Sequence, residues 1–112
     1  MSELDSAKYD EAKLLASLGL CARARKLIFG VPMICDAMRS GKNSLPLIIF
    51  ESSDTSENTH KRIADKAAYY GVRTVRLKCD GATLASALGK TSSLGAVAIT
   101  DEQMCKMVEK YI

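Results

Sequence analysis

Helix signals and strand signals alternate along this chain of 112 residues, and the alternation limits the fold to the α/β class. Residues 45–50 and 95–99 are continuous apolar runs, short enough to be buried strands. Residues 72–77 alternate apolar side chains with arginines, which is typical of a strand near a sheet edge. Apolar residues at helical spacing fill the segments between these strands. The pattern predicts a mostly parallel sheet between two helical layers, a three-layer α/β/α sandwich.

Proline, glycine and acidic side chains mark where the helices begin and end. Pro32 suits a first helical turn, because proline lacks an amide hydrogen that this position does not need. Three aspartates are predicted to be N-caps, and three glycines, Gly41, Gly71 and Gly89, are predicted to end helices. The predicted helices run from Tyr9 to residues 19–24, from Gly30 to Ser40, from Asp54 to Gly71, from Asp80 to Gly89, and from Asp101 onward.

The length suits one domain, since single domains cluster near ~100–150 residues. We expect residues 1–112 to form that domain, with residues 1–8 as a loose N-terminal tail. The apolar runs are far shorter than the ~20 residues of a membrane-spanning helix, and residues 1–10 lack the apolar core of a signal peptide. The expectation is a cytoplasmic monomer that does not associate with membranes.

Cysteine and histidine usage indicates neither a metal site nor a disulfide framework. The four cysteines are widely spaced without a CxxC pair, whereas structural zinc sites bring their ligands in close pairs. Their neighbours are apolar, so we expect reduced, structural thiols. The single histidine, His60, falls on a charged helix face and is predicted to be solvated.

The net charge of +3 is concentrated in two blocks. Residues 23–42 carry five bases against one acid, Asp36, and residues 73–78 carry three bases and no acid. The bases of the first block are Arg23, Arg25, Lys26, Arg39 and Lys42. A polyanion is a reasonable partner for such a block, although clustered charge is also common on an ordinary solvated face.

No enzyme signature accompanies these charges. The sequence contains no GxGxxG, Walker, HExxH or GxSxG motif, so we expect neither catalysis nor a cofactor. The helix start at Gly30 instead offers free amides beside the first basic block, a combination suited to a phosphate backbone. Phe29 and Leu94 are the candidates for contact with a base, because the chain has no tryptophan and few aromatic residues.

Several motifs resemble one protein family. They are Leu18-Gly19-Leu20, Arg23-Ala24, Lys26-Leu27, Gly30, Arg39-Ser40-Gly41-Lys42, Leu47-Ile48-Ile49, Asp54-Thr55-Ser56-Glu57-Asn58-Thr59 and Ala96-Val97-Ala98-Ile99-Thr100-Asp101-Glu102. In this order and spacing they resemble the small bacterial members of the seven-Ae / thirty-e superfamily of large-subunit ribosomal proteins. The resemblance implies an α/β/α sandwich on a mixed four-stranded sheet. It therefore implies a further strand, for which residues 26–29 or Val31 are available, and some antiparallel pairing.

The resemblance also implies binding to kink-turn RNA, an internal loop bent at tandem sheared G·A pairs, through residues 30–36 and 89–95. With the basic block, the predicted RNA contacts are Arg23, Arg25, Lys26, Gly30, Val31, Pro32, Met33, Arg39, Lys90, Ser92, Ser93 and Leu94. Kink-turn binders of the family carry an Asn-Glu pair or polar substitutes two and three residues after the glycine, and a lysine six residues after it. This chain has Pro32, Met33 and Asp36 there, which predicts altered or weakened kink-turn specificity.

Three functional hypotheses follow. The first is an RNA-binding, ribosome-associated accessory protein whose partner is structured, ribosomal RNA. The second is a protein-protein interaction module of the same fold, with the apolar Pro32-Met33 tip as its contact surface. The third is a fragment of an RNA ribose methyltransferase, against which the missing length for a cofactor-binding domain argues.

Overall fold

The computed structural model describes residues 10–40 and 46–112. Those residues form five helices and four strands: α2 (Glu11–Arg23), β1 (Leu27–Phe29), α3 (Val31–Ser40), β2 (Ile48–Glu51), α4 (Glu57–Tyr70), β3 (Arg73–Arg76), α5 (Gly81–Ala87), β4 (Ala96–Ile99) and α6 (Glu102–Glu109). The predicted N-terminal tail at 1–8 lies outside the described residues. No helix within the described ranges is long and apolar enough to cross a membrane.

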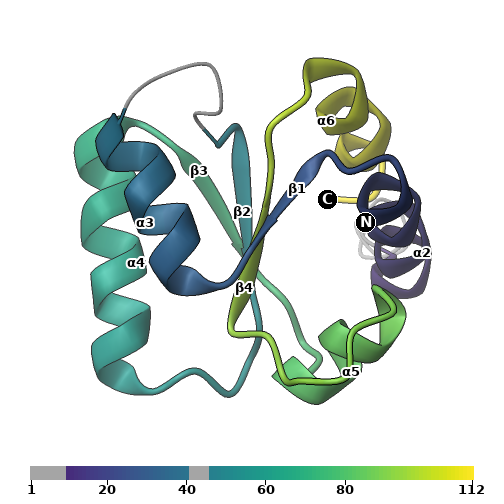
Figure 1. Cartoon of the computed structure of the whole chain (residues 1–112), viewed down its shortest axis with the longest axis horizontal. Helices are drawn as coiled ribbons and strands as arrows, with labels where there is room; N and C mark the ends of the chain where they lie inside the picture. The colour runs from purple at the N-terminus through teal and green to yellow at the C-terminus, as the bar shows by residue number, and fades with distance from the viewer. Residues whose placement is uncertain (1–9, 41–45) are drawn as a thin grey trace, which may run out of the picture.

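The four strands form one mixed sheet in the order β1-β4-β2-β3 (Figure 1). β4 runs antiparallel to both of its neighbours, and β2 and β3 are parallel. The expectation of a mostly parallel sheet is therefore wrong, whereas the mixed four-stranded sheet implied by the family resemblance is confirmed. The sheet is mixed because β4 runs against both β1 and β2, a direction that has no local signal. The unpredicted strand is β1, whose three residues directly after α2 are too few to produce a periodic pattern.

Helices cover both faces of the sheet. α3 and α4 lie on one face, and α2, α5 and α6 lie on the other (Figure 1). Successive residues of β4 point to opposite faces, so Val97 and Ile99 join the core under α2, while Ala96 and Ala98 join the core under α3. The predicted three-layer sandwich is confirmed.

The helix caps agree with the sequence except at one position. Asp80 and Asp101 accept hydrogen bonds from the amides of Thr83 and Met104, as N-caps do. Asp54 was expected to cap α4, but Ser56 does so. The carboxylate of Asp54 instead accepts a hydrogen bond of 2.9 Å from the amide of Gly81, a contact across the fold that local spacing does not reveal.

Glu51, at the end of β2, corrects the prediction for His60. The strand predicted at 45–50 spans Ile48–Glu51, and the side chain of Glu51 is 4% exposed. Nδ1 of His60 lies 2.9 Å from Oε1 of Glu51, and the Thr55 hydroxyl donates to the same carboxylate. His60 is therefore not a merely solvated residue. It is half-exposed and partners a buried acid, which explains how Glu51 is tolerated inside the sheet.

The cysteines differ in burial. Cys21 and Cys35 are buried, Cys79 and Cys105 are half-buried, and all four are free thiols. In the part of the chain that the structure describes, no group of histidine, cysteine, aspartate or glutamate residues could hold a metal ion.

Candidate nucleic-acid interface

The start of α3 is open to a ligand. Gly30 precedes the helix at φ +90°, donates its amide to the carbonyl of Ala96, and has no side chain with which to cap the helix. The first turn carries no acid, and Met33 on that turn is 60% exposed. The positive end of the helix dipole therefore faces solvent without a side-chain anion of its own.

Two loops meet this helix start. A Cβ built on Gly95 would lie 3.4 Å from side-chain carbons of both Thr55 and Val31, so residues 52–56 and the loop before β4 border the beginning of α3. The second loop was predicted from the sequence to belong to the site, whereas the first was not. Asp54 and Thr55 were predicted to begin a helix, and the position of Thr55 near Val31 depends on strand order, which has no local signal.

A basic hollow lies next to β1 on the α2 side of the sheet. We call it the β1 hollow; its volume is about 310 Å³, and its walls include Arg23, Arg25, Leu27, Phe29, Leu88 and Lys90. The ammonium group of Lys90 lies 4.4 Å from the centre of the Phe29 ring, a cation–π contact between the last predicted loop and β1. The structure thus brings three of the predicted RNA contacts, Arg23, Arg25 and Lys90, to one place.

Arg25 occupies a backbone conformation that normally favours glycine. The amides of Arg25 and Lys26 donate to the carbonyls of Ala22 and Cys21, which closes α2 with a Schellman turn. Arg25 lies at φ 61°, and no other described non-glycine residue has a positive φ. A side chain in this region costs roughly 1–2 kcal/mol, so the arginine is retained here against a local energetic cost.

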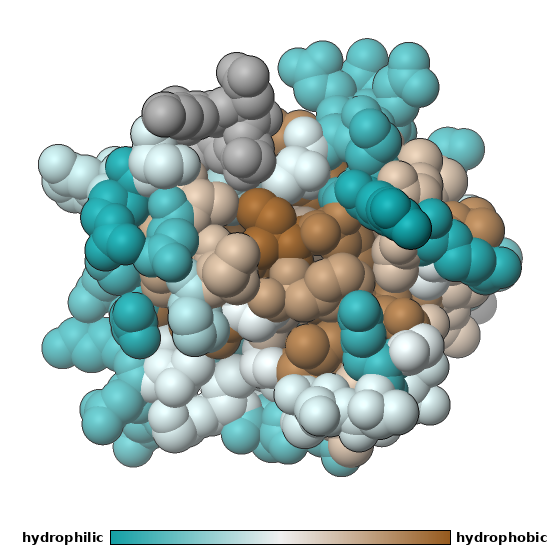
Figure 2. Space-filling view, viewed as in Figure 1, coloured by the Kyte–Doolittle hydropathy of each residue, from teal (hydrophilic) through white to brown (hydrophobic). Residues whose placement is uncertain are grey.

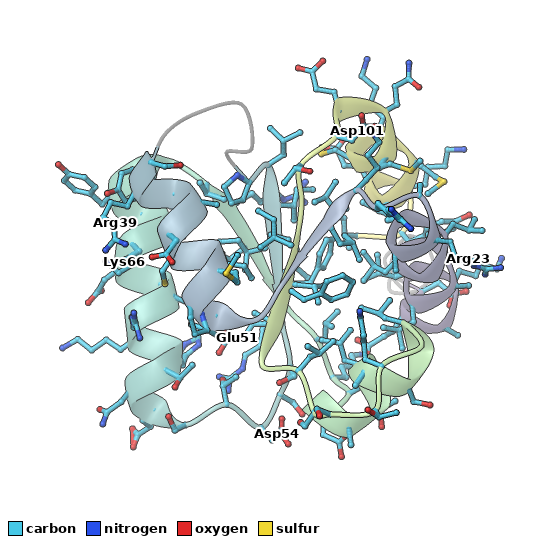
Figure 3. All side chains as sticks on the ribbon, viewed as in Figure 1. Arg23, Arg39, Glu51, Asp54, Lys66 and Asp101 are labelled. Carbon is cyan, nitrogen blue, oxygen red and sulfur yellow. The ribbon has the colours of Figure 1, made fainter. Side chains whose placement is uncertain are left out.

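Two of the predicted basic contacts, Lys26 and Arg39, do not line the β1 hollow. Arg39 is in the last turn of α3, where it forms an ion pair with Asp36, and Figure 3 shows Arg23 and Arg39 on opposite sides of the molecule. The two arginines, both predicted RNA contacts, therefore do not share one surface, because Arg39 lies at the end of α3 that is far from Gly30. Lys26 lies beside the hollow, with its ammonium group 3.9 Å from the carboxylate of Asp101.

The loop before β4 contributes both polar and apolar groups. Ser92 and Ser93 are exposed, while Leu94 is half-buried and packs against the core under α2. The amide of Leu94 donates to the carbonyl of Gly81 at 3.1 Å. A Cβ on Gly81 would lie 2.3 Å from the Ser93 hydroxyl and 2.7 Å from the Leu94 carbonyl, so the loop rests directly on the start of α5.

The surface above β1 is apolar. Figure 2 shows hydrophobic residues gathered at the centre of this face, over β1, with hydrophilic residues around them. All three residues of β1 are half-buried rather than covered. An apolar centre with cations at its margin suits a ligand that combines flat apolar groups with negative charge.

Neither the Cys21 thiol nor the Cys79 thiol is activated as a nucleophile. Burial raises the pKa of the Cys21 thiol to about 11, and burial together with the neighbouring Glu11 raises that of Cys79 to about 11. A hydrogen bond from Thr83 lowers the pKa of Asp80, which favours the charged cap of α5. Thiols with raised pKa values stay protonated near neutral pH and are poor nucleophiles.

These features define the class. A mixed sheet in this order between two helical layers, with an uncapped helix start beside the loop before the last strand, is the fold of the seven-Ae / thirty-e superfamily of ribosomal proteins. The protein of unknown function from Bacillus halodurans C has the same fold, with a TM-score of 0.76 and 28% sequence identity over 87% of this chain and 93% of that one. The 15.5kD RNA binding protein of Giardia lamblia shares the fold alone, with a TM-score of 0.74 and 12% identity over 95% and 90% of the two chains.

Sequence relatives identify the family within this superfamily. The RNA-binding protein YlxQ of Bacillus subtilis is 34% identical over 85 residues, which cover 76% of this chain and 80% of that protein. YlxQ of Enterococcus faecium is 32% identical over 100 residues, 89% of this chain and 91% of that protein. The chain therefore belongs to the YlxQ family within the seven-Ae / thirty-e superfamily. No profile of a protein family matches the sequence.

Proposed function

We propose that this chain is a non-catalytic RNA-binding protein that associates with structured RNA of the ribosome in the cytoplasm. The observation that carries the proposal is the uncapped start of α3, which lies beside a loop on each side and close to the β1 hollow. Backbone amides and a helix dipole bind phosphate without regard to sequence, and arginine and lysine add charge. The names of the YlxQ relatives support RNA binding.

The proposed interface contains most of the predicted residues. Its contacts are Arg23, Arg25, Lys26, Gly30, Val31, Pro32, Met33, Lys90, Ser92, Ser93 and Leu94, to which we add Thr55. Arg39 is left out because its guanidinium pairs with Asp36 at the other end of α3. We further propose that the chain acts as a monomer and that residues 1–112 form one domain.

Kink-turn specificity is proposed to be weak. Neither Pro32 nor Met33 has a side-chain donor or acceptor suited to a guanine edge, although both are exposed at the helix start. Asp36 places a carboxylate on the exposed face one turn further along. Replacing the three residues with Asn, Glu and Lys should raise affinity for a standard kink-turn much more than for a plain duplex, by roughly 1–3 kcal/mol for each regained contact.

The direct test measures the salt dependence of binding. We expect fluorescence anisotropy with a kink-turn RNA and with a scrambled duplex to give an affinity that falls linearly with salt on logarithmic axes. Arg25→Gln and Lys90→Gln should each reduce the slope by about one, equally for both RNAs. Arg73→Gln is the matched control, because Arg73 forms an ion pair with Glu109 far from this surface. An unchanged slope in the first two variants would contradict the proposed interface.

The exposed side chain of Met33 also favours a second candidate, a protein-protein contact at the Pro32-Met33 tip. A protein that retains a partner but no RNA after purification from its own cells would support this alternative. Loss of that partner in Met33→Lys, with an unchanged melting temperature, would place the contact at the tip.

A further inference from the structure

The β1 hollow differs from the rest of the proposed interface in that it has depth as well as charge. Its volume of about 310 Å³ is at the lower end of the ~300–1,000 Å³ range of small-ligand sites. The start of α3, by contrast, offers the backbone amides of a first helical turn. A hollow of this size can enclose one planar group together with one anion.

The floor of the hollow is apolar and partly aromatic. Leu27 and Phe29 point to the same side of β1, because alternate residues of a strand share a face. Leu88, at the end of α5, adds a third apolar wall. An aromatic ring at the edge of a sheet is a platform on which any nucleic-acid base can stack, because every base has a flat π-face.

The margin of the hollow is cationic, and no acidic residue in its lining balances the positive charge. Arg23, Arg25 and Lys90 come from three different segments. Among the described residues, the salt bridges involve other cations, namely Lys26, Arg39, His60 and Arg73. Three like charges around one depression repel one another and attract an anion into it.

The backbone adds a second, independent sign of function. Among the described residues, three helix ends have a residue in the left-handed region, and two of them use glycine, Gly71 and Gly89. The third is Arg25, whose side chain lines the hollow. Strain of this kind persists where the side chain has a task, and a glycine at this position would remove both the strain and the charge.

We propose that the β1 hollow binds one nucleotide unit, with its base against Leu27 and Phe29 and its phosphate among Arg23, Arg25 and Lys90. The nucleotide can come from two sources: an unpaired residue of a bound RNA, or a free mononucleotide. The first source rests on the proposed RNA-binding function, whereas the second does not. Lys90 moves between the ring of Phe29 and the phosphate, since a cation–π contact is weaker than a charge-assisted hydrogen bond.

The experiment has two arms, each with the full-length chain. In the first arm, adenosine monophosphate, adenosine and ribose 5-phosphate are titrated separately, and NMR follows the backbone amides of Leu27, Phe29 and Gly89. In the second arm, anisotropy measures the affinity for a kink-turn hairpin with blunt ends and for the same hairpin with a four-nucleotide single-stranded extension. The proposal predicts that the extended hairpin binds more tightly than the blunt hairpin.

Two variants and two controls locate the site. Phe29→Leu keeps an apolar strand but removes the ring. It should reduce the affinity gained from the single-stranded extension by about fivefold or more. Arg25→Gly should lower the affinity for the extended hairpin about tenfold, while the melting temperature stays equal or rises because the backbone strain is relieved. Ile28→Val, on the opposite face of β1, and Lys61→Gln, on α4, should leave the gain unchanged.

Each outcome decides something. Chemical shift changes with the monophosphate that exceed those with adenosine and ribose 5-phosphate support the proposal and identify the free nucleotide as a sufficient ligand. If the extended hairpin binds more tightly than the blunt hairpin, and this gain depends on Phe29 and Arg25, the result supports the proposal with RNA as the source of the nucleotide. If the blunt hairpin binds normally and neither arm responds to Phe29→Leu, the hollow is not a nucleotide site, although the proposed function stands. If no RNA binds to the wild-type chain, the proposed function fails, and the mononucleotide arm alone decides the hollow.

Discussion

The two edges of the sheet are built in opposite ways. At the β3 edge, Arg73 lies 3.7 Å from Glu109 of α6, and Arg76 donates a hydrogen bond of 3.2 Å to the carbonyl of Ser53. Most of the strand is exposed and polar. Its arginines tie β3 to neighbouring elements, and charge along an edge strand also prevents further strands from adding to the sheet.

At the β1 edge the strand itself is apolar, and the charges stand around it. Leu27, Ile28 and Phe29 are half-buried, and the cations that line the β1 hollow belong to the preceding and following segments. Arg25 is even held in a conformation that its own backbone disfavours.

The comparison separates two uses of the same residue type. Arg73 and Arg76, near β3, are paired with groups of the protein itself, so we expect their removal to lower stability slightly and to leave RNA binding unchanged. Arg23 and Arg25, near β1, form no ion pair with the described residues, so we expect their removal to affect binding more than stability. Four predictions test that division, beginning with the largest expected effect.

Gly81→Ala should lower the free energy of unfolding by about 2–3 kcal/mol, because the new methyl group would overlap the Leu94 carbonyl and displace the loop beside the β1 edge. Gly71→Ala, just before β3, is the matched control. A Cβ there meets nothing within 4 Å, so only the left-handed backbone should cost about 1 kcal/mol. Urea denaturation measures both values. Equal costs would show that the loop is not held against α5 as described.

Raising the pH should destabilise the turn that carries Arg25. Cys21 belongs to this turn, because its backbone carbonyl accepts the hydrogen bond from Lys26. Burial raises the pKa of the Cys21 thiol from 9.0 to about 11. The unfolded chain therefore loses this proton first, and stability present below pH 9 is lost as the pH rises towards 11, by up to about 2 kcal/mol. Cys21→Ala should show a smaller loss over the same range in urea titrations. Identical pH profiles would remove Cys21 from this account.

Leu94→Ala should cost about 1–2 kcal/mol of stability, less than the roughly 2–5 kcal/mol of a fully buried leucine, because Leu94 is only half-buried. Its exposed part borders the proposed interface, so RNA binding should weaken as well. Thermal melts and anisotropy separate the two effects. A variant that melts normally and binds RNA as tightly as the wild type would remove Leu94 from the interface.

Arg73→Gln should change stability by no more than about 0.5 kcal/mol, since its ion pair with Glu109 is half-exposed on both sides. It should also leave the salt slope of RNA binding unchanged. Arg25→Gln should show a comparable small stability change but a reduced slope. If Arg73→Gln reduces the slope as much as Arg25→Gln does, the two edges are not functionally distinct.

Much of the local structure was predictable. Asp80 and Asp101 cap helices because their carboxylates bond an amide three residues later, an interaction that depends only on local spacing. The apolar run ending in Ile99 forms a buried strand for an equally local reason, its near-continuous hydrophobicity. The family resemblance added the mixed sheet, which the alternation of helices and strands alone had predicted wrongly.

The misassigned residues share a physical cause. Asp54 bonds Gly81, 27 positions away, and His60 partners Glu51 across the end of β2, so neither contact has a signature in its own neighbourhood. Arg39 lies on the predicted helix but not on the surface of Arg23, because charge counted along the chain does not record which end of α3 lies near the other cations.

The sequence by itself determined the class of fold, the order and boundaries of most elements, and the presence of a basic block near a helix start, because these depend on periodicity, capping and composition. Only the tertiary structure decided that β1 lies at an open edge beside β4, that Lys90 lies against Phe29, and that three cations surround one hollow. The physical reason is strand order: pairing residues 27–29 with residues 97–99 brings together segments about seventy positions apart, and no local pattern encodes that choice.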